Sequence, residues 1–318
     1  MKKILTLLLA LAAALFTASC SRDDKPSIRF VTGGEAGTYY AFGSVIAQHA
    51  TNNTDYRFIG LAGSGSQGNI LTLQDGTAEL AFAQSDVLSY AYEGINTFEQ
   101  TGRVDCFSVV GALYTEQVQI VTLNPEIKTV ADLRGRTVSI GASGSGVYFN
   151  AIDILRVYGL SEQDIKATYQ SFGDSADALK DGKIDAAFIV AGAPTTAVTD
   201  LATTKNVYLV GLDDAHINVL IARSPYYVQC TIPKSTYGLD GDVQSVAVGA
   251  VVIARNDLPE DVVYSLCEDI FENAPKLASS HAKYREVFPE YGASIRSVPY
   301  HPGAARYFAE KGLEVPTR

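Results

Sequence analysis

Short apolar segments that end in glycine-rich turns recur along this chain, and each turn is followed by a helix-like pattern. Residues 28–32 run into Gly33-Gly34, 56–61 run toward Gly63-Ser64-Gly65, and 137–141 run into Ser143-Gly144-Ser145-Gly146. Strands that alternate with helices predict parallel sheets covered by helices on their faces. The pattern therefore predicts an α/β protein.

The strand and helix alternation occurs twice, which predicts two α/β units. Strand patterns lie at 28–32, 56–61, 79–83, 106–113 and 118–123 in the first series, and at 137–141, 168–172, 186–191 and 207–212 in the second. A strand pair (226–232 and 245–253) and two helices (259–281 and 301–311) follow. Pro275 lies inside the first of these helices and should break or kink it.

The second unit is too short to be followed by a complete third domain, so the C-terminal segment should return to the first unit. We therefore predict a first lobe of residues 28–114 plus 214–318 and a second lobe of residues 115–213. The chain would cross between the lobes near 114–117 and 212–216, which leaves a ligand cleft between them.

The N-terminus has the three parts of an export signal. Lys2 and Lys3 precede an apolar run over 4–16, and the small residues 17–19 precede Cys20. We interpret 1–19 as a signal peptide and 20–27 as a polar tether. Small residues before a single cysteine resemble a bacterial lipoprotein box, which makes Cys20 a candidate lipidation site, with ordinary signal cleavage as the alternative.

Composition narrows the function. The chain has 318 residues, with 35 acidic and 25 basic side chains and a net charge of −10. This balance argues against nucleic-acid binding, which requires a basic face. Cys106, Cys230 and Cys267 have no C-x-x-C spacing, so we expect no metal site and interpret them as small buried residues, with one disulfide as an alternative.

Four loops could carry the function, because each follows a strand and opens a helix: 32–40, 62–69, 83–86 and 141–146. The first amide groups of a helix have no partner within the helix, and the helix dipole adds about half a positive charge there. Glycine lets the backbone approach a ligand, and serine or threonine adds a hydroxyl donor. Together the loops predict a site that binds an anion through backbone dipoles, although tight turns alone could explain each loop.

Signals for catalysis are weak. Residues 63–68 match the G-x-G-x-x-G dinucleotide pattern, but they follow the second strand rather than the first. No G-x-S-x-G motif is present, and His49, His216, His281 and His301 have no metal-ligand spacing. A nucleotide-binding exported enzyme stays an alternative to a binding protein, and we predict no cofactor.

Four parts of the chain carry recognisable motifs: Gly-Thr-Tyr-Tyr at 37–40, residues 130–138 with 141–146, residues 185–188 with 191–194, and residues 301–307. Together they resemble the TAXI family, the extracytoplasmic solute-binding proteins of one class of tripartite ATP-independent periplasmic (TRAP) transporters. The resemblance covers essentially residues 28–315. It implies a two-lobed, type II-like periplasmic-binding-protein fold of the Venus-flytrap kind.

The resemblance also implies ligand-binding residues, which coincide with the glycine-rich loops. In the first lobe they are Thr38, Tyr39, Ser64, Gln67 and Gln84. In the second lobe Ser143, Gly144, Ser145 and Gly146 would form a nest for a carboxylate, Gly192 and Thr195 would lie near the rim, and Gln119 would tune selectivity.

The function implied by the resemblance is the capture of a small organic anion, such as glutamate, glutamine or a dicarboxylate. The partners would be this carboxylated solute and the membrane permease subunits of a TRAP transporter. A lipoprotein sensor that binds the same ligands and signals to a receptor is a further alternative.

Overall fold

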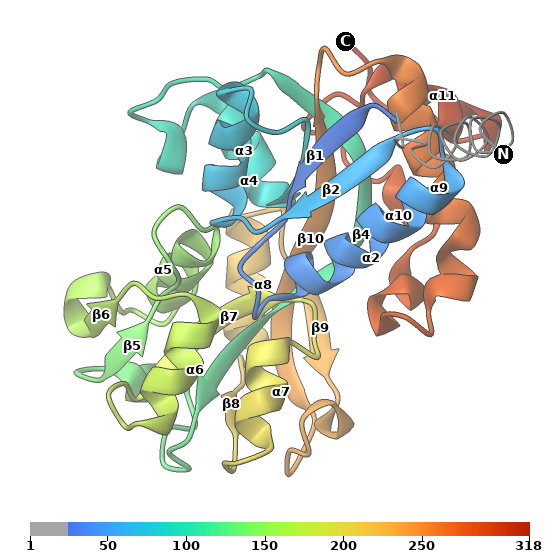
Figure 1. Cartoon of the computed structure of the whole chain (residues 1–318). Coiled ribbons are helices and arrows are strands. Elements are labelled where there is room, and N and C mark those ends of the chain that lie inside the picture. The colour runs from blue at the N-terminus through green and yellow to red at the C-terminus, as the bar shows by residue number, and fades with distance from the viewer. Residues whose placement is uncertain (1–24) are drawn as a thin grey trace, which may run out of the picture.

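The computed structural model describes residues 25–318. It consists of two α/β lobes, one above the other in Figure 1, which are connected by long strands that belong to both. Within the described residues, no helix is both long enough and apolar enough to cross a membrane. The signal peptide predicted for 1–19 and the candidate lipidation site Cys20 lie outside the described residues.

The first lobe contains the strand order β2-β1-β3-β10-β4. Its parallel strands are β1 (Ser27–Val31), β2 (Arg57–Leu61) and β3 (Leu80–Gln84). Strand β1 lies between the other two, with Phe30 paired to both Gly60 and Leu80. Its helices are α2 (Thr38–Asn53), α3 (Ser66–Gln74), α4 (Ser85–Glu93), α9 (Glu260–Leu277), α10 (Pro289–Gly292) and α11 (Pro302–Glu310).

The second lobe repeats this plan with shorter strands. Strand β5 (Thr137–Ser139) lies parallel between β6 (Lys166–Thr168) and β7 (Ala186–Ala191). All six residues of β7 are buried, as expected for a strand covered on both faces. The remaining elements are α5 (Val147–Val157), α6 (Phe172–Lys180), α7 (Thr196–Ala202), β8 (Tyr208–Val210), α8 (Asp214–Arg223) and β9 (Val228–Ile232). Short 3₁₀ segments are η1 (Asn96–Phe98), η2 (Val130–Leu133), η3 (Glu162–Asp164), η4 (Lys234–Thr236) and η5 (Ala282–Glu286).

Two long antiparallel strands join the lobes, β4 (Phe107–Thr122) and β10 (Val243–Arg255). They pair from Gln117 opposite Ala247 to Phe107 opposite Arg255. The sheets are therefore mixed, because β10 is also antiparallel to β3, and β4 is antiparallel to β7 and β8. Two details of the prediction are wrong: 106–113 and 118–123 form one continuous strand, and the second crossing lies in β10 rather than at 212–216.

The boundary between the hydrophobic cores of the two lobes lies partway along β4 and β10. The core of the first lobe includes Tyr114 and Ala250, whereas the main core of the second lobe includes Val118 and Val248. Residues of the segment that follows Asp213 also pack in this second core, namely Ile217, Leu220, Tyr227 and Val246. We therefore propose a second lobe of about residues 117–248 in place of the 115–213 expected from the sequence.

Other elements match the sequence prediction with two exceptions. The strand expected at 168–172 is absent, since β6 ends at Thr168 and α6 begins at Phe172. The cause is a helix cap, in which the Ser171 hydroxyl accepts a hydrogen bond from the Asp174 amide. Helix α9 also continues past Pro275 and ends two residues later at Leu277, rather than extending to 281.

The three cysteines of the described chain are free. Cys267 is buried on α9, and Cys106 and Cys230 are partly buried. Residues 25–318 also contain no group of three histidine, cysteine, aspartate or glutamate side chains placed to hold a metal ion.

Candidate functional site

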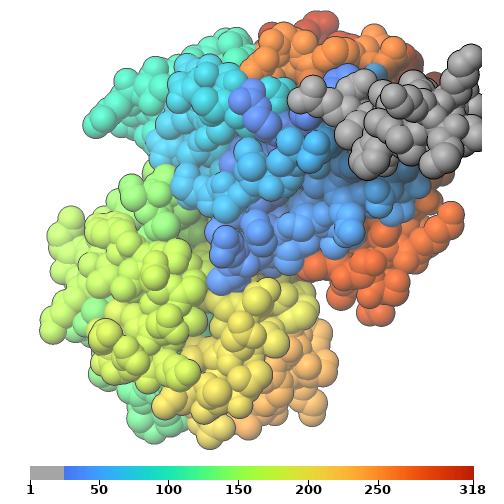
Figure 2. All heavy atoms as spheres, viewed as in Figure 1, coloured from blue at the N-terminus to red at the C-terminus, as the bar shows by residue number. Residues whose placement is uncertain are grey.

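A cavity of about 570 Å³ lies between the two lobes, within the size range of small-molecule sites. Its walls come from loops at the carboxyl ends of the parallel strands, which is where ligands bind in α/β sheets. Figure 2 shows the two lobes meeting along the level of this cavity. The lining residues are 33–39, 63–66, Gln84, Glu116, Ala142, 145–147, 170–174, Asp177, Val190 and Ala191.

Four helices begin at the cavity wall: α2, α3, α5 and α6. The residues that precede the first three are Gly37, Gly65 and Gly146, and none of these helices has a side-chain cap. Apart from the Gly68 amide of α3, which bonds to Gly144, their first amide groups are therefore open to hydrogen bonds from a ligand. The four helix dipoles direct positive partial charge at one space. Three of these helix starts lie in the loops singled out from the sequence, and the fourth, at α6, was not predicted.

The lobes touch each other through main-chain groups beside the cavity. The Gly68 amide donates to the Gly144 carbonyl at 3.2 Å, and the Ala197 amide donates to the Ala36 carbonyl at 3.1 Å. The Thr38 hydroxyl adds a third contact, donating to the Gly192 carbonyl at 2.7 Å. These three bonds describe an arrangement in which the lobes are closed on each other.

Gly146 has to be a glycine in this arrangement. A Cβ atom at this position would lie 1.6 Å from Gln84 Oε1, which belongs to the opposite lobe. Gln84 is itself buried, and its Nε2 donates to Asn150 Oδ1 at 2.9 Å. The close approach of α5 to β3 therefore depends on the missing side chain.

Six of the predicted ligand-binding residues line the cavity: Thr38, Tyr39, Ser64, Gln84, Ser145 and Gly146. They come from both lobes, so the cavity brings together segments that are far apart in the sequence. Their contact with a solute stays a prediction.

The other six predicted residues lie outside the lining: Gln67, Gln119, Ser143, Gly144, Gly192 and Thr195. Most of them have partners within the protein. Gln67 Nε2 donates to the Thr97 carbonyl at 2.7 Å. Gln119 Nε2 donates to Thr195 Oγ1 at 3.0 Å, and the Tyr237 hydroxyl donates to Gln119 Oε1. In this closed arrangement their contacts are structural.

The charges in the lining were not predicted from the sequence. Its ionisable side chains other than tyrosine are carboxylates, namely Glu35, Glu116, Asp174 and Asp177, and none of the described lining residues is lysine or arginine. Glu35, Asp174 and Asp177 are exposed, whereas Glu116 is 2% exposed. The buried carboxyl group is therefore the one whose charge matters most, because water screens the other three.

Glu116 lies on β4 where the strand crosses between the lobes. The Tyr39 hydroxyl donates to its Oε2 at 2.6 Å, and this is its only side-chain partner among residues 25–318. Burial raises the pKa of Glu116 well above the ordinary value; the Tyr39 hydrogen bond opposes this, the Asp86 charge adds to it, and the Lys283 charge lowers it.

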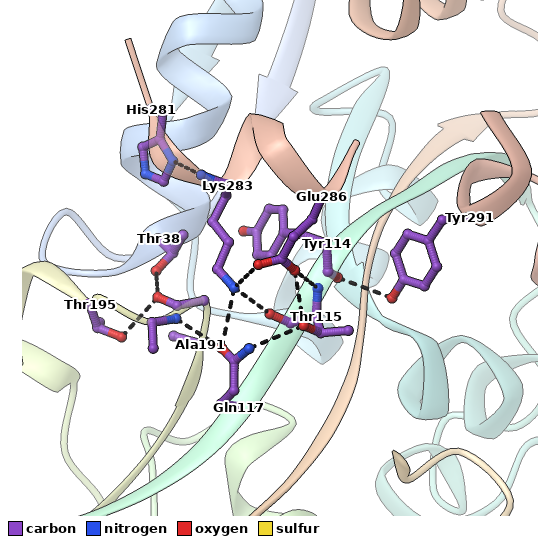
Figure 3. Close-up of polar contacts among 12 residues, drawn as sticks. Thr38, Tyr114, Thr115, Gln117, Ala191, Thr195, His281, Lys283, Glu286 and Tyr291 are labelled. Atoms are coloured by element: carbon purple, nitrogen blue, oxygen red, sulfur yellow. Dashed lines mark hydrogen bonds and ion pairs between the residues drawn. The ribbon is translucent and has the colours of Figure 1, made fainter. Parts of the chain in front are cut away.

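Lys283 is a buried cation whose charge acts on Glu116, but its hydrogen bonds go to other residues (Figure 3). It lies on η5, is 3% exposed, and its Nζ donates to Thr115 O at 3.2 Å, Gln117 Oε1 at 3.3 Å and Glu286 Oε1 at 2.6 Å. Gln117 Oε1 also accepts from the Ala193 amide at 2.9 Å. This network fixes the crossing point of β4 to both lobes and lies outside the cavity lining.

A second buried carboxyl group lies between the lobes. Asp86, at the start of α4, accepts a hydrogen bond at 3.0 Å from Asn150 Nδ2 of α5, and its Oδ1 is buried without a partner among the described residues. Burial raises the pKa of Asp86 to about 6. Asn150 Nδ2 also donates to the Tyr227 hydroxyl at 2.8 Å, so this contact joins three segments.

The G-x-G-x-x-G loop at 63–68 lines the cavity with its first four residues only. Its last glycine gives its amide to Gly144 of the other lobe. This segment serves as a contact between lobes and as part of a helix start, which gives no particular support to a pyrophosphate site.

Solved structures of binding proteins are similar to this fold at low sequence identity. The alkanesulfonate-binding protein SsuA from Xanthomonas axonopodis pv. citri bound to MOPS is 16% identical, over 90% of this chain and 84% of that chain, with a TM-score of 0.50. An ancestral arginine-binding protein bound to arginine is 15% identical, over 83% and 99%, with a TM-score of 0.51. The ligand-binding component of an ABC-type import system from Staphylococcus aureus, with zinc bound, is 11% identical, over 82% and 79%, with a TM-score of 0.53.

These likenesses confirm the predicted fold class, an α/β fold of the type II-like periplasmic solute-binding proteins. The narrower resemblance to the TAXI family stays a prediction. The sequence also matches the model of the NMT1-like family over residues 30–312, which is most of its length. The chain therefore belongs to the NMT1-like family.

Proposed function

We propose that the protein is an extracytoplasmic solute-binding receptor that holds a small organic molecule between its lobes and catalyses no reaction on it. The observation that carries this proposal is the cavity between the lobes, toward which four helices direct their N-termini. The fold adds support, because structural neighbours with the same fold are named as binding proteins.

The solute in this proposal is a small carboxylated molecule, such as glutamate, glutamine or a dicarboxylate. Open amide groups at α2, α3 and α5 suit a carboxylate, and the Ser64 hydroxyl lies beside them. Hydrogen bonds to a charged group contribute about 1.5–3 kcal/mol each. A few of them, less the cost of ordering the lobes, support a dissociation constant on the order of 1 μM.

The proposed partner is a membrane permease, to which the closed form would deliver the solute. The resemblance of the sequence to the TAXI family favours a TRAP permease, with Cys20 as the candidate lipid anchor. One structural neighbour is named as part of an ABC-type import system. Pull-down of the ligand-loaded protein with permease subunits of each type would separate the two classes.

Binding is tested by a thermal-shift screen of the mature protein after unfolding and refolding have removed any solute carried through purification. The library contains mono- and dicarboxylates, amino acids, amines, sulfonates and sugars. We expect a rise in melting temperature with at least one carboxylate-bearing compound, confirmed by calorimetric titration. If no compound in the library stabilises the protein, the proposed function is wrong.

A further inference from the structure

The lining of the cavity contains one buried carboxyl group that no cation neutralises. Glu116 is 2% exposed, lines the cavity and has a single hydrogen bond, from Tyr39. A carboxylate that is removed from water without a positive partner is strongly disfavoured. Without a solute, burial therefore favours the protonated acid, and the carboxylate becomes favourable only when a positive group lies beside it.

Among residues 25–318, no lysine or arginine lines the cavity to complete the pair. Lys283 is bound to Thr115, Gln117 and Glu286. Glu35, Asp174 and Asp177 add negative charge around the same space. A positive group that pairs with Glu116 would therefore have to belong to the solute.

We propose that the solute carries a primary ammonium group as well as its carboxylate, and that Glu116 binds this ammonium. The inference rests on the proposed function and narrows its ligand class from organic anions to amino carboxylates. The carboxylate would lie against the open helix starts of α2, α3 and α5, and the ammonium would lie at the crossing strand β4. A dicarboxylate without an amine would place its charge near Glu116 with nothing to offset it.

Binding of an ammonium has a consequence for protons. The charged or titratable groups around Glu116 are Tyr39 on α2, Asp86 on α4, Tyr114 on its own strand, Lys283 on η5 and Tyr291 on α10. Burial raises the pKa of Glu116, so the empty cavity favours the protonated acid. An ammonium favours the carboxylate, so binding releases a proton and the affinity increases as the pH rises.

The first test uses the native protein and matched pairs of probes that differ by the amine alone. The pairs are glutamate and glutarate, leucine and 4-methylpentanoate, and phenylalanine and 3-phenylpropanoate, supplemented with the deaminated form of any other amino acid found in the screen. We expect the amine-bearing member to bind about 10- to 100-fold more tightly in the pair that fits. Titration in two buffers of different ionisation enthalpy should show proton release.

The second test removes the charge of Glu116 with little change of shape. In Glu116→Gln, affinity for the amino acid should fall about 10- to 100-fold and its rise with pH should disappear. Glu99→Gln is the matched control, because Glu99 is exposed and outside the lining, and it should bind as the native protein does. The matched pairs decide the question even if the Glu116 variant does not fold.

Two results would overturn the inference while leaving the proposed function intact. One is equal or tighter binding of the deaminated member of every pair that binds. The other is a Glu116→Gln variant that keeps native affinity, which would show that binding does not need the charge of Glu116. Failure of every compound in the library to bind would instead reject the proposed function itself.

Discussion

At the scale of single residues, the buried carboxyl group of Asp86 has the clearest consequence for stability. It lies between the lobes with one oxygen unpartnered, and burial raises its pKa to about 6. The folded protein therefore holds this proton more tightly than the unfolded chain does. Its favourable contribution is complete below the ordinary value of 3.8 and is lost as the pH rises through about 6.

Asp86→Asn should remove this dependence on pH. The difference in the free energy of unfolding between the variant and the native protein should shift in favour of the variant by up to about 3 kcal/mol from pH 4 to pH 7. Urea denaturation at several pH values measures it. Asp200→Asn, at an exposed position, is the control and should follow the native curve. Parallel curves for Asp86→Asn and the native protein would contradict the assignment.

At the scale of elements, the start of α5 is placed by steric contact with the opposite lobe. Gly146→Ala should keep the two lobes apart, because the added methyl group meets the Gln84 side chain. We expect solute affinity to fall about tenfold, in line with the cost of overpacking a tight contact. Calorimetric titration with the tightest compound from the screen measures this loss.

Gly241→Ala is the control for this effect. A Cβ atom at Gly241 meets no atom within 4 Å, so its affinity should match that of the native protein. Small-angle scattering of the solute-saturated proteins adds a second reading, and the Gly146 variant should have the larger radius of gyration. Equal affinity and equal radius for both variants would show that α5 moves without cost.

Elements were predictable where the local sequence decides them. The glycine turns at 33–37, 63–65 and 141–146 each separate a strand from a helix, as predicted. The continuity of β4 was missed because Thr115, Glu116 and Gln117 look like a polar turn, whereas the structure uses them at the crossing between lobes. The strand predicted at 168–172 ends at Thr168, because Ser171 caps the helix that follows. The Ser-x-x-Asp pattern of this cap is present in the sequence, but the prediction did not take it into account.

At the scale of the whole molecule, β4 and β10 make the lobes structurally dependent on each other. Both strands contribute to the core of each lobe, so loss of one lobe exposes apolar surface in the other. We therefore expect a single cooperative unfolding transition. Phe82→Ala in the first lobe and Phe188→Ala in the second should each lower the temperature of that one transition. Each should reduce the free energy of unfolding by about 3–5 kcal/mol, because both rings are fully buried.

Differential scanning calorimetry distinguishes this expectation from independent lobes. A second transition that appears in one variant, with the other transition unmoved, would contradict it. Tyr169→Ala, which removes a largely exposed ring, is the control and should leave the transition temperature nearly unchanged.

The negative charge of the cavity lining depends on the fold of the whole molecule, and for this reason it was not predicted from the sequence. Glu116 comes from a crossing strand, Asp174 from a helix of the second lobe and Glu35 from a loop of the first. No local spacing links these residues; only the closure of the lobes places them around one cavity. The loops proposed to bind the carboxylate are local patterns in the sequence, whereas the position of Glu116 in the cavity depends on the complete fold.

Two of the contacts that hold the lobes together at the cavity are made by the main chain alone, between Gly68 and Gly144 and between Ala197 and Ala36. A substitution cannot remove an amide hydrogen or a carbonyl oxygen unless it introduces proline. Side chains that line the cavity can therefore change while the closed form keeps these two bonds. If the proposed function is correct, the same closed arrangement is compatible with cavity linings that suit different solutes.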